Sequence, residues 1–224
     1  MIDREAVVSA FTRLEGPCYV GPRTHVLGAK IRGGTTLGPN CRVGGEVEAS
    51  ILHGHSNKYH DGFLGHSYVG EWVNLGAGTQ NSDLRNDYGE VNVVVDGQLV
   101  RTGQSKVGCF IGDHTKTAIG SLFNTGSSIG VMCLILPDGE LLPKHVPSFS
   151  RIWHGELIEG LPLEQGLATA RAALERRNME QTDAQEQLLR RVHAQTLAER
   201  GRAIHRFAEK AAVSVSPHVE TTSR

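Results

Sequence analysis

A six-residue period is the feature that most constrains this chain. It recurs at Leu14, Val20 and Val26 and, after a single shift of register, at Ile31, Leu37 and Val43. Further runs are Val69 and Leu75, and Ile111, Thr117, Phe123, Ile129 and Ile135. The period fits neither the 3.6 residues of a helical turn nor the two-residue alternation of a strand. It is typical of short strands joined by regular turns, with three strands in each triangular coil. The sequence therefore predicts an all-β solenoid, a left-handed parallel β-helix of hexapeptide repeats, between Leu14 and Ile135.

Two segments interrupt the repeat. Residues 51–62 (ILHGHSNKYHDG) carry three histidines, a lysine and an aspartate, which are too polar for a solenoid interior. In the second interruption, residues 80–105, apolar and polar residues alternate on both sides of Asp96-Gly97, a strong signal for a hairpin turn. We expect a polar loop at the first segment and a projecting β-hairpin in the second.

A different architecture is expected after the last hexad. Three prolines between residues 137 and 147 end the regular pattern. Apolar residues at helical spacing from Leu163 to Leu174 predict a helix with Arg176 and Arg177 in its last turn, and a capping box at residues 182–185 opens another. The helices are expected to cover an open end or edge of the solenoid, with partner docking as the alternative.

These patterns divide the chain into three parts. The expected organisation is a hexapeptide-repeat β-helix over residues 1–152, a C-terminal α-helical extension over 153–212, and a disordered tail over 213–224.

Charge and composition limit the partners. With 23 basic and 24 acidic residues the net charge is −1, so neither nucleic acid nor an anionic membrane surface is indicated. Asp3 and Glu5 stand where a signal peptide would be basic, and no apolar run approaches the ~20 residues of a membrane span. The four cysteines lie far apart, which favours reduced thiols over a disulfide scaffold. We expect a soluble cytoplasmic protein.

The polar segments contain the candidate chemistry. His60 precedes the point where the repeat resumes, and histidine is a common general base for an amine or hydroxyl nucleophile. Asn74, Asn81 and Asp83 follow within some twenty-five residues, and their short polar side chains suit hydrogen bonding to a substrate.

Three sequence motifs carry a family resemblance. SNKYHDGFLG (56–65) and EWVNLGAGTQNSDLRNDYGEV (71–91) resemble the acetyltransferase half of the bifunctional glucosamine-1-phosphate N-acetyltransferase/N-acetylglucosamine-1-phosphate uridylyltransferase family. The run CFIGDHTKTAIGSLFNTGSSIG (109–130) is similar to the alternative bacterial branch of that family and to archaeal sugar-1-phosphate nucleotidylyltransferase/acetyltransferases. The resemblance covers most of residues 14–195.

The resemblance implies a homotrimer that binds acetyl-CoA between subunits. It implies that His60 is the catalytic base, which accepts a proton from the amino group of glucosamine 1-phosphate. Asn74 matches an asparagine that contacts the sugar, and Arg32 matches an arginine that holds the sugar phosphate. An arginine suits that role because its planar fork pairs bidentately with phosphate.

The chain departs from the family pattern at two positions. Phe63 stands where the better-known enzymes have a tyrosine, and their phosphate-binding lysine falls near Ser50. Another cation is therefore expected to bind phosphate, and Lys106 is favoured because it resembles a basic position of the archaeal enzymes. The candidates for this role are Lys58, Arg85, Lys106 and Lys116.

The resemblance leads to a functional prediction. We expect an acetyl-CoA-dependent N-acetyltransferase that acts on an amino-sugar 1-phosphate in nucleotide-sugar synthesis, with His114 and Lys116 binding the acetyl-CoA cosubstrate. No glycine-rich nucleotide-binding segment stands near the N-terminus, so uridylyl transfer is not expected of this chain. A separate sugar nucleotidyltransferase is the expected partner.

Two other functions fit the same fold. A γ-class carbonic anhydrase would hold zinc with His55, His60 and a third histidine, either His25 or His114. A trimeric scaffold or regulatory module would keep the solenoid without acyl transfer, as Phe63 and the absent lysine suggest. The acetyltransferase assignment itself includes no metal ligand.

Overall fold

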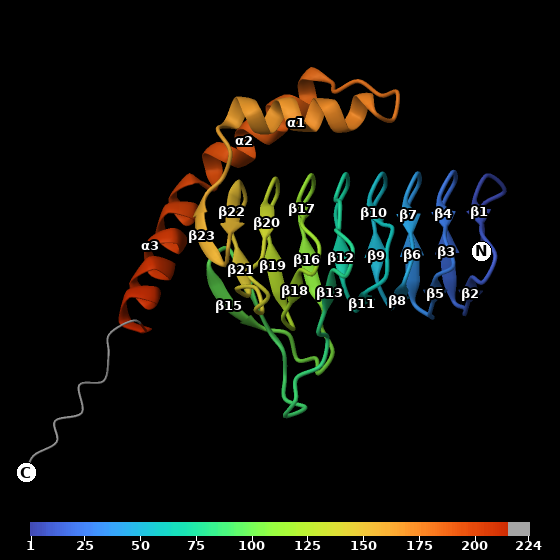
Figure 1. Ribbon diagram of the computed structural model, residues 1–224, viewed down its shortest axis with the longest axis horizontal. Coiled ribbons are helices and arrows are strands. Elements are labelled where there is room, and N and C mark those ends of the chain that lie inside the picture. The colour runs from blue at the N-terminus through green and yellow to red at the C-terminus, as the bar shows by residue number, and fades with distance from the viewer. Residues whose placement is uncertain (215–224) are drawn as a thin grey trace, which may run out of the picture.

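Short parallel strands stack into a three-sided solenoid in the computed structural model, which describes residues 1–214 (Figure 1). Each coil contributes one strand to each of the three faces in turn, so neighbouring strands of one sheet are separated in sequence by a whole coil. Val20 pairs with Leu37, for example, and Leu37 pairs with Leu52. The left-handed parallel β-helix predicted from the hexads is confirmed.

Each face is one column of strands. The first face contains β1 (Val7–Val8), β4 (His25–Val26), β7 (Arg42–Val43), β10 (Asn57–Lys58), β17 (Lys116–Thr117), β20 (Leu134–Leu136), β22 (Ser150–Trp153) and antiparallel β23 (Glu156–Glu159). The second contains β2 (Arg13–Leu14), β5 (Lys30–Ile31), β8 (Glu46–Glu48), β11 (Phe63–Gly65), β13 (Gln80–Asn81) and β18 (Leu122–Phe123). The third contains β3 (Cys18–Val20), β6 (Thr35–Leu37), β9 (Ile51–Leu52), β12 (Tyr68–Val69), β16 (Cys109–Ile111), β19 (Ser127–Ile129) and β21 (His145–Val146).

The core is the stack of inward hexad positions. Every predicted inward residue from Val20 to Ile135 is buried, and only Leu14, near the first coil, is partly accessible. Because equivalent positions of successive coils lie in register, each inward side chain packs on the one above and the one below. The hexad pattern therefore describes one continuous apolar core along the axis.

The polar loop predicted for residues 51–62 is wrong, because this segment is a regular coil that contains β9 and β10. Leu52, Lys58 and Leu64 are six apart and all point inward. Lys58 is accommodated because its ammonium group donates to the backbone carbonyls of Gly44, at 3.1 Å, and His60, at 2.6 Å. The repeat was concealed because a lysine occupies an inward position.

The solenoid extends beyond the hexads recognised between Leu14 and Ile135 and fills the range expected for the β-helix, residues 1–152. It begins with β1, before Leu14, and continues after Ile135 through β21 and β22. Pro137, Pro143 and Pro147 do not end the fold, because they lie between strands, where a missing N–H group costs no ladder hydrogen bond.

The predicted hairpin is confirmed. Strands β14 (Asn92–Val95) and β15 (Gln98–Arg101) pair antiparallel. Asp96 and Gly97 form the turn with φ of 48° and 73°, the left-handed conformation that this two-residue connection requires.

Three helices follow the solenoid: α1 (Leu163–Glu175), α2 (Asp183–Gln195) and α3 (Leu197–Ser214). The capping box is confirmed, since the Thr182 hydroxyl and the Gln185 side chain satisfy each other's backbone N–H groups. Arg176 is the C-terminal cap of α1, so the two arginines follow the helix instead of lying in its last turn. Of the predicted tail, residues 213–214 belong to α3 and residues 215–224 lie outside the described residues.

The helices cover two parts of the solenoid (Figure 1). Ala203, Ile204 and Phe207 of α3 pack against the core at its C-terminal end, so α3 is the expected cap. The segment α1 instead runs back above the coils, and Leu167 and Ala170 pack on Phe149. Within residues 1–214, no helix is both long enough and apolar enough to span a bilayer.

Candidate functional site

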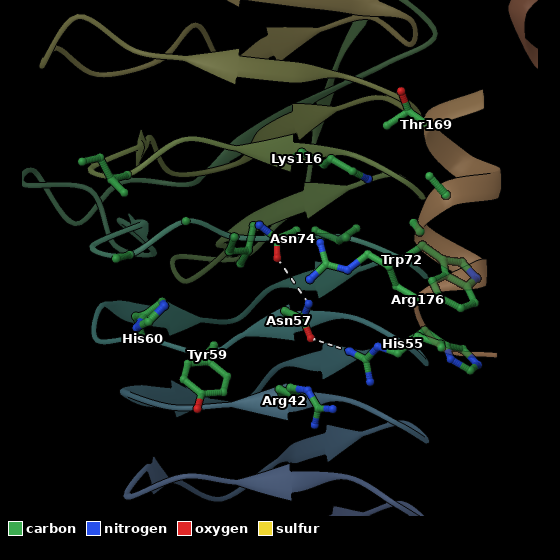
Figure 2. Close-up of a pocket in the computed structure, with 18 residues that line it drawn as sticks. Arg42, His55, Asn57, Tyr59, His60, Trp72, Asn74, Lys116, Thr169 and Arg176 are labelled. Atoms are coloured by element: carbon green, nitrogen blue, oxygen red, sulfur yellow. Dashed lines mark hydrogen bonds between the residues drawn. The ribbon is translucent and has the colours of Figure 1, made fainter. Parts of the chain in front are cut away.

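A cleft of about 790 Å³ separates α1 from the first face of the solenoid (Figure 2). Strands β7, β10 and β17 form one wall, and the C-terminal half of α1 forms the other. The cleft is lined by Arg42, His55, Asn57, Tyr59, His60, Trp72, Val73, Asn74, Leu75, Gly76, Ala77, Lys116, Ile119, Thr169, Ala172, Ala173, Arg176 and Arg177.

His60 lies at the end of the cleft away from α1 (Figure 2). It follows β10 at a corner of the coil, and its side chain is exposed. The backbone of this corner is fixed because the buried Lys58 ammonium group donates to the His60 carbonyl. The Tyr59 ring contacts the imidazole edge-on, with centroids 4.9 Å apart. The corner therefore presents an imidazole on a rigid backbone, as a general base requires.

A chain of hydrogen bonds connects the α1 wall to Asn74. Arg177 Nη2 donates to Asn57 Oδ1 at 2.9 Å, and Asn57 Nδ2 donates to Asn74 Oδ1 at 3.2 Å. Arg177 Nη1 also donates to the carbonyl of Asn40, at 3.3 Å. Because the arginine can only donate, it fixes the orientation of the Asn57 amide, which in turn fixes that of Asn74. The Asn74 NH₂ group is thereby left to donate to a ligand.

A column of stacked rings lies at the corner beneath α1. His55 stacks on Trp72 with centroids 4.2 Å apart, and Trp72 is parallel to His114 at 6.3 Å. All three residues have φ near 60°, the left-handed conformation that turns the chain at this corner. Burial, followed by the nearby charge of Lys116, lowers the pKa of His114 to about 4. His114 is therefore a neutral side chain at physiological pH.

The pKa of His114 leads to a prediction for stability. Since the folded protein keeps His114 neutral and the unfolded chain protonates near pH 6.5, its stabilisation is present above pH 6.5 and is lost as pH falls toward 4. Between pH 7 and pH 4.5 we expect wild type to lose about 2 kcal/mol more unfolding free energy than His114→Phe, which keeps a stacking ring. Urea titrations at the two pH values measure the difference, and equal losses would contradict the assignment.

Of the two residues predicted to bind acetyl-CoA, Lys116 lines the cleft and His114 does not. His114 does not line the main cleft but a small adjoining cavity with Met132, Phe149 and Gly166. Lys116 lines both spaces, and its ammonium group donates to the His114 carbonyl at 3.2 Å. Burial lowers the pKa of Lys116.

Two residues predicted to bind substrate point into the solenoid instead. Lys58 and Asn81 occupy inward hexad positions, with 2% and 5% of their surfaces exposed. The Asn81 amide bonds the backbone N–H and carbonyl of Gly65, at 2.9 and 3.0 Å. Burial lowers the pKa of Lys58 to about 8. Their polar groups are occupied by backbone partners, so neither is placed to contact a ligand in the cleft.

Arg32 also lies outside the cleft. Its guanidinium is exposed near β5 and pairs with Glu48 at 2.8 Å and with Glu46 at 3.4 Å. It lines a separate surface depression with Arg13 and Lys30. Within one protomer, the arginine expected to bind phosphate is therefore not brought to His60.

The remaining candidates lie around the inserted segment. Asp83 accepts a hydrogen bond from His66 Nδ1 at 2.7 Å. Lys106 is exposed, and its backbone forms an isolated antiparallel bridge with Leu84. Arg85 pairs with Asp87. None of these side chains lines the cleft that contains His60.

Sequence reasoning missed four polar residues that line the cleft. Arg42 and Asn57 were not proposed as site residues, and Arg176 and Arg177 were noted only for their positions in a helix. The outward position of Arg42, one residue before inward Val43, is the signal that could have placed it on this face. No sequence pattern indicated that α1 would return to the same coils.

The three-histidine arrangement of a zinc enzyme is not formed within one protomer. Among residues 1–214 no group of three His, Cys, Asp or Glu side chains is close enough together to hold a metal ion. His55 is stacked on Trp72, whereas His60 lies at the far end of the cleft (Figure 2).

Comparison with solved structures gives neighbours of low sequence identity. A hexapeptide transferase family protein from Anaplasma phagocytophilum is 15% identical with a TM-score of 0.49, covering 84% of this chain and 90% of that chain. PerB from Caulobacter crescentus, in complex with CoA and GDP-perosamine, is 13% identical with a TM-score of 0.34, covering 67% of this chain and 51% of that chain.

Sequence relatives match part of the chain, although no protein-family model matches. The bifunctional sugar-1-phosphate nucleotidylyltransferase/acetyltransferase of Sulfurisphaera tokodaii is 39% identical over 92 residues, 41% of this chain and 23% of the relative. The bifunctional protein GlmU of Methanocaldococcus jannaschii is 36% identical over 109 residues, 48% of this chain and 26% of the relative. The matched part is thus about a quarter of the length of these relatives. The resemblance expected from the motifs is confirmed: this chain is similar to part of the bifunctional nucleotidylyltransferase/acetyltransferases.

Proposed function

We propose that this chain is an acyltransferase that moves the acetyl group of acetyl-CoA to the amino group of an amino-sugar 1-phosphate. One observation carries the proposal: His60 and Asn74, the two residues expected from the family motifs to act on the sugar, line the same cleft. The similarity to nucleotidylyltransferase/acetyltransferases supports the reaction class.

The proposed chemistry is a single acyl transfer. His60 accepts a proton from the sugar amine as the nitrogen attacks the thioester carbonyl, so the new C–N bond forms and the C–S bond breaks. CoA leaves as the thiolate and takes up a proton. Asn74 donates a hydrogen bond that orients the sugar, since its amide is held by Asn57 and Arg177.

The proposal is tested by thiol release. The protein is incubated with acetyl-CoA and glucosamine 1-phosphate, and free CoA thiol is followed over time. Release that requires the amine supports acyl transfer, and galactosamine 1-phosphate as an alternative acceptor defines the sugar. Release no faster than that of a His60→Ala variant would contradict the proposal and favour the non-catalytic scaffold.

We also propose that three copies associate through the third face of the solenoid. Ile51, Tyr68 and Phe110 lie in one outward row of adjacent strands, with 43%, 43% and 39% of their surfaces exposed. Such a continuous apolar row is typical of an association surface. The separate nucleotidyltransferase expected from the sequence stays a prediction.

A charge in the middle of this row tests the assembly. Phe110→Arg is expected to convert a trimer into monomers, because a guanidinium cannot be buried in an apolar interface without a partner. Sedimentation velocity gives the mass. Phe11→Arg, at a side chain 98% exposed near the other end of the fold, is the matched control and is expected to stay trimeric. A trimeric Phe110→Arg protein would exclude this face.

A further inference from the structure

The α1 end of the cleft contains an excess of positive charge. Arg42, Lys116, Arg176 and Arg177 line it, and no aspartate or glutamate among residues 1–214 does. Over the same described residues, none of these four cations has a carboxylate within ion-pair distance. The cleft therefore concentrates cations without supplying their counter-charge.

Two other arginines on the surfaces of α1 and α2 have carboxylate partners. Arg171 pairs with Glu186 at 2.8 Å, and Arg190 contacts both Glu164 and Glu186. The charges of these two arginines, which do not line the cleft, are thus neutralised by glutamates of α1 and α2. Within α1 and the turn after it, the arginine outside the cleft is therefore paired, whereas Arg176 and Arg177, which line the cleft, have no carboxylate partner in the described chain.

The unpaired arginines come from both walls. Arg42 extends from β7 of the solenoid, whereas Arg176 follows α1, and both point into the space beside Asn57 and Asn74 (Figure 2). Arg177 lines the same cleft; burial lowers its pKa, and the charges of Arg42 and Arg176 lower it further. Bringing like charges together is unfavourable unless an anion lies between them.

The geometry suits an oxyanion with several acceptor oxygens. Guanidinium groups pair bidentately with phosphate, and two arginines from opposite walls can contact different oxygens of one phosphoryl group. Arg177 is less available, because its donors already bond Asn40 and Asn57. Asn74, at the same level of the cleft, supplies a neutral donor for the rest of the ligand.

We propose that the α1 end of the cleft is a phosphate-binding subsite, in which Arg42 of the solenoid and Arg176 of the helical extension hold one phosphoryl group of a substrate. The identity of that substrate rests on the proposed function, under which the phosphoryl group belongs either to the CoA part of the donor or to the amino-sugar phosphate. The role belongs to this pair of arginines and not to Arg32, Lys58 or Lys106, which do not line the cleft.

Calorimetric binding without turnover tests the subsite. Four ligands are titrated into the full-length protein: CoA, pantetheine, glucosamine 1-phosphate and glucosamine. The double variant Arg42→Gln/Arg176→Gln is compared with wild type and with Arg191→Gln, an exposed α2 arginine without an ion pair in the described chain. We expect the double variant to bind one phosphorylated ligand about 10- to 100-fold more weakly, whereas Arg191→Gln binds as wild type does.

The pattern of losses identifies the source of the phosphate. A loss for CoA but not pantetheine assigns the subsite to the donor, and a loss for glucosamine 1-phosphate but not glucosamine assigns it to the acceptor. Added salt should weaken wild-type binding of that ligand more than binding to the double variant. Unchanged affinity for both phosphorylated ligands, in a variant with wild-type circular dichroism, would overturn the inference. Binding that depends on these arginines without thiol release would contradict only the proposed function.

Discussion

A His60→Ala variant is expected to lose about 10²- to 10⁴-fold in kcat for amine acetylation, with little change in the affinity for either substrate. The reason is that His60 lies at one end of the cleft, where it would accept a proton, while the cations and Asn74 that would hold the ligands lie elsewhere in it. Steady-state thiol release gives kcat, and calorimetry with each substrate alone gives the affinities.

His25→Ala is the matched control for this experiment. His25 begins β4 on the same face of the solenoid, two strands from β10, and does not line the cleft. Its removal is expected to leave kcat unchanged. A mild His60→Ala variant together with an inactive His114→Ala variant would contradict the assignment of the base.

The largest expected loss of stability comes from Phe123→Ala. Phe123 is 1% exposed at an inward position of β18, where it pairs in register with Asn81 of the preceding coil. Truncating a buried phenylalanine removes its apolar burial and leaves a cavity that a stacked solenoid cannot easily close, which costs about 3–5 kcal/mol. Chemical denaturation at neutral pH measures the change in unfolding free energy.

Phe11→Ala makes the same chemical change where almost nothing is buried. The Phe11 side chain is 98% exposed, so the expected change is within about 0.5 kcal/mol. Similar losses for the two variants would show that position 123 is not a core position, and would contradict the continuous apolar column.

The hexad pattern predicted the fold because each coil is specified locally. An aliphatic residue every six positions determines which side chain turns inward, and the next coil has an aliphatic residue at the equivalent position. At two inward positions with long polar side chains, this reasoning failed. Lys58 and Asn81 were interpreted as ligand contacts because lysine and asparagine seldom occupy a core. In the structure their polar groups bond backbone atoms of the coils.

The candidate site was only partly predictable for a different reason. His60 and Asn74 lie in local motifs, and both line the cleft. The opposite wall depends on a contact between Arg177 and Asn40, 137 residues apart in sequence. Neither residue carries a local signal for the other, because helical periodicity shows that α1 has an apolar face but not which coils that face will meet.

This distant contact also determines when the cleft exists. The coils can form successively from near-neighbour contacts, but the cleft acquires its second wall only after a chain of about 177 residues has been completed and α1 has returned. α1 is packed on Phe149 and on α2, and the turn that follows it is tethered to the solenoid through Arg177, with the cleft between these contacts. Because the hydrogen bonds within each coil do not involve α1, the cleft can gain or lose its second wall while the backbone ladder of the solenoid stays formed.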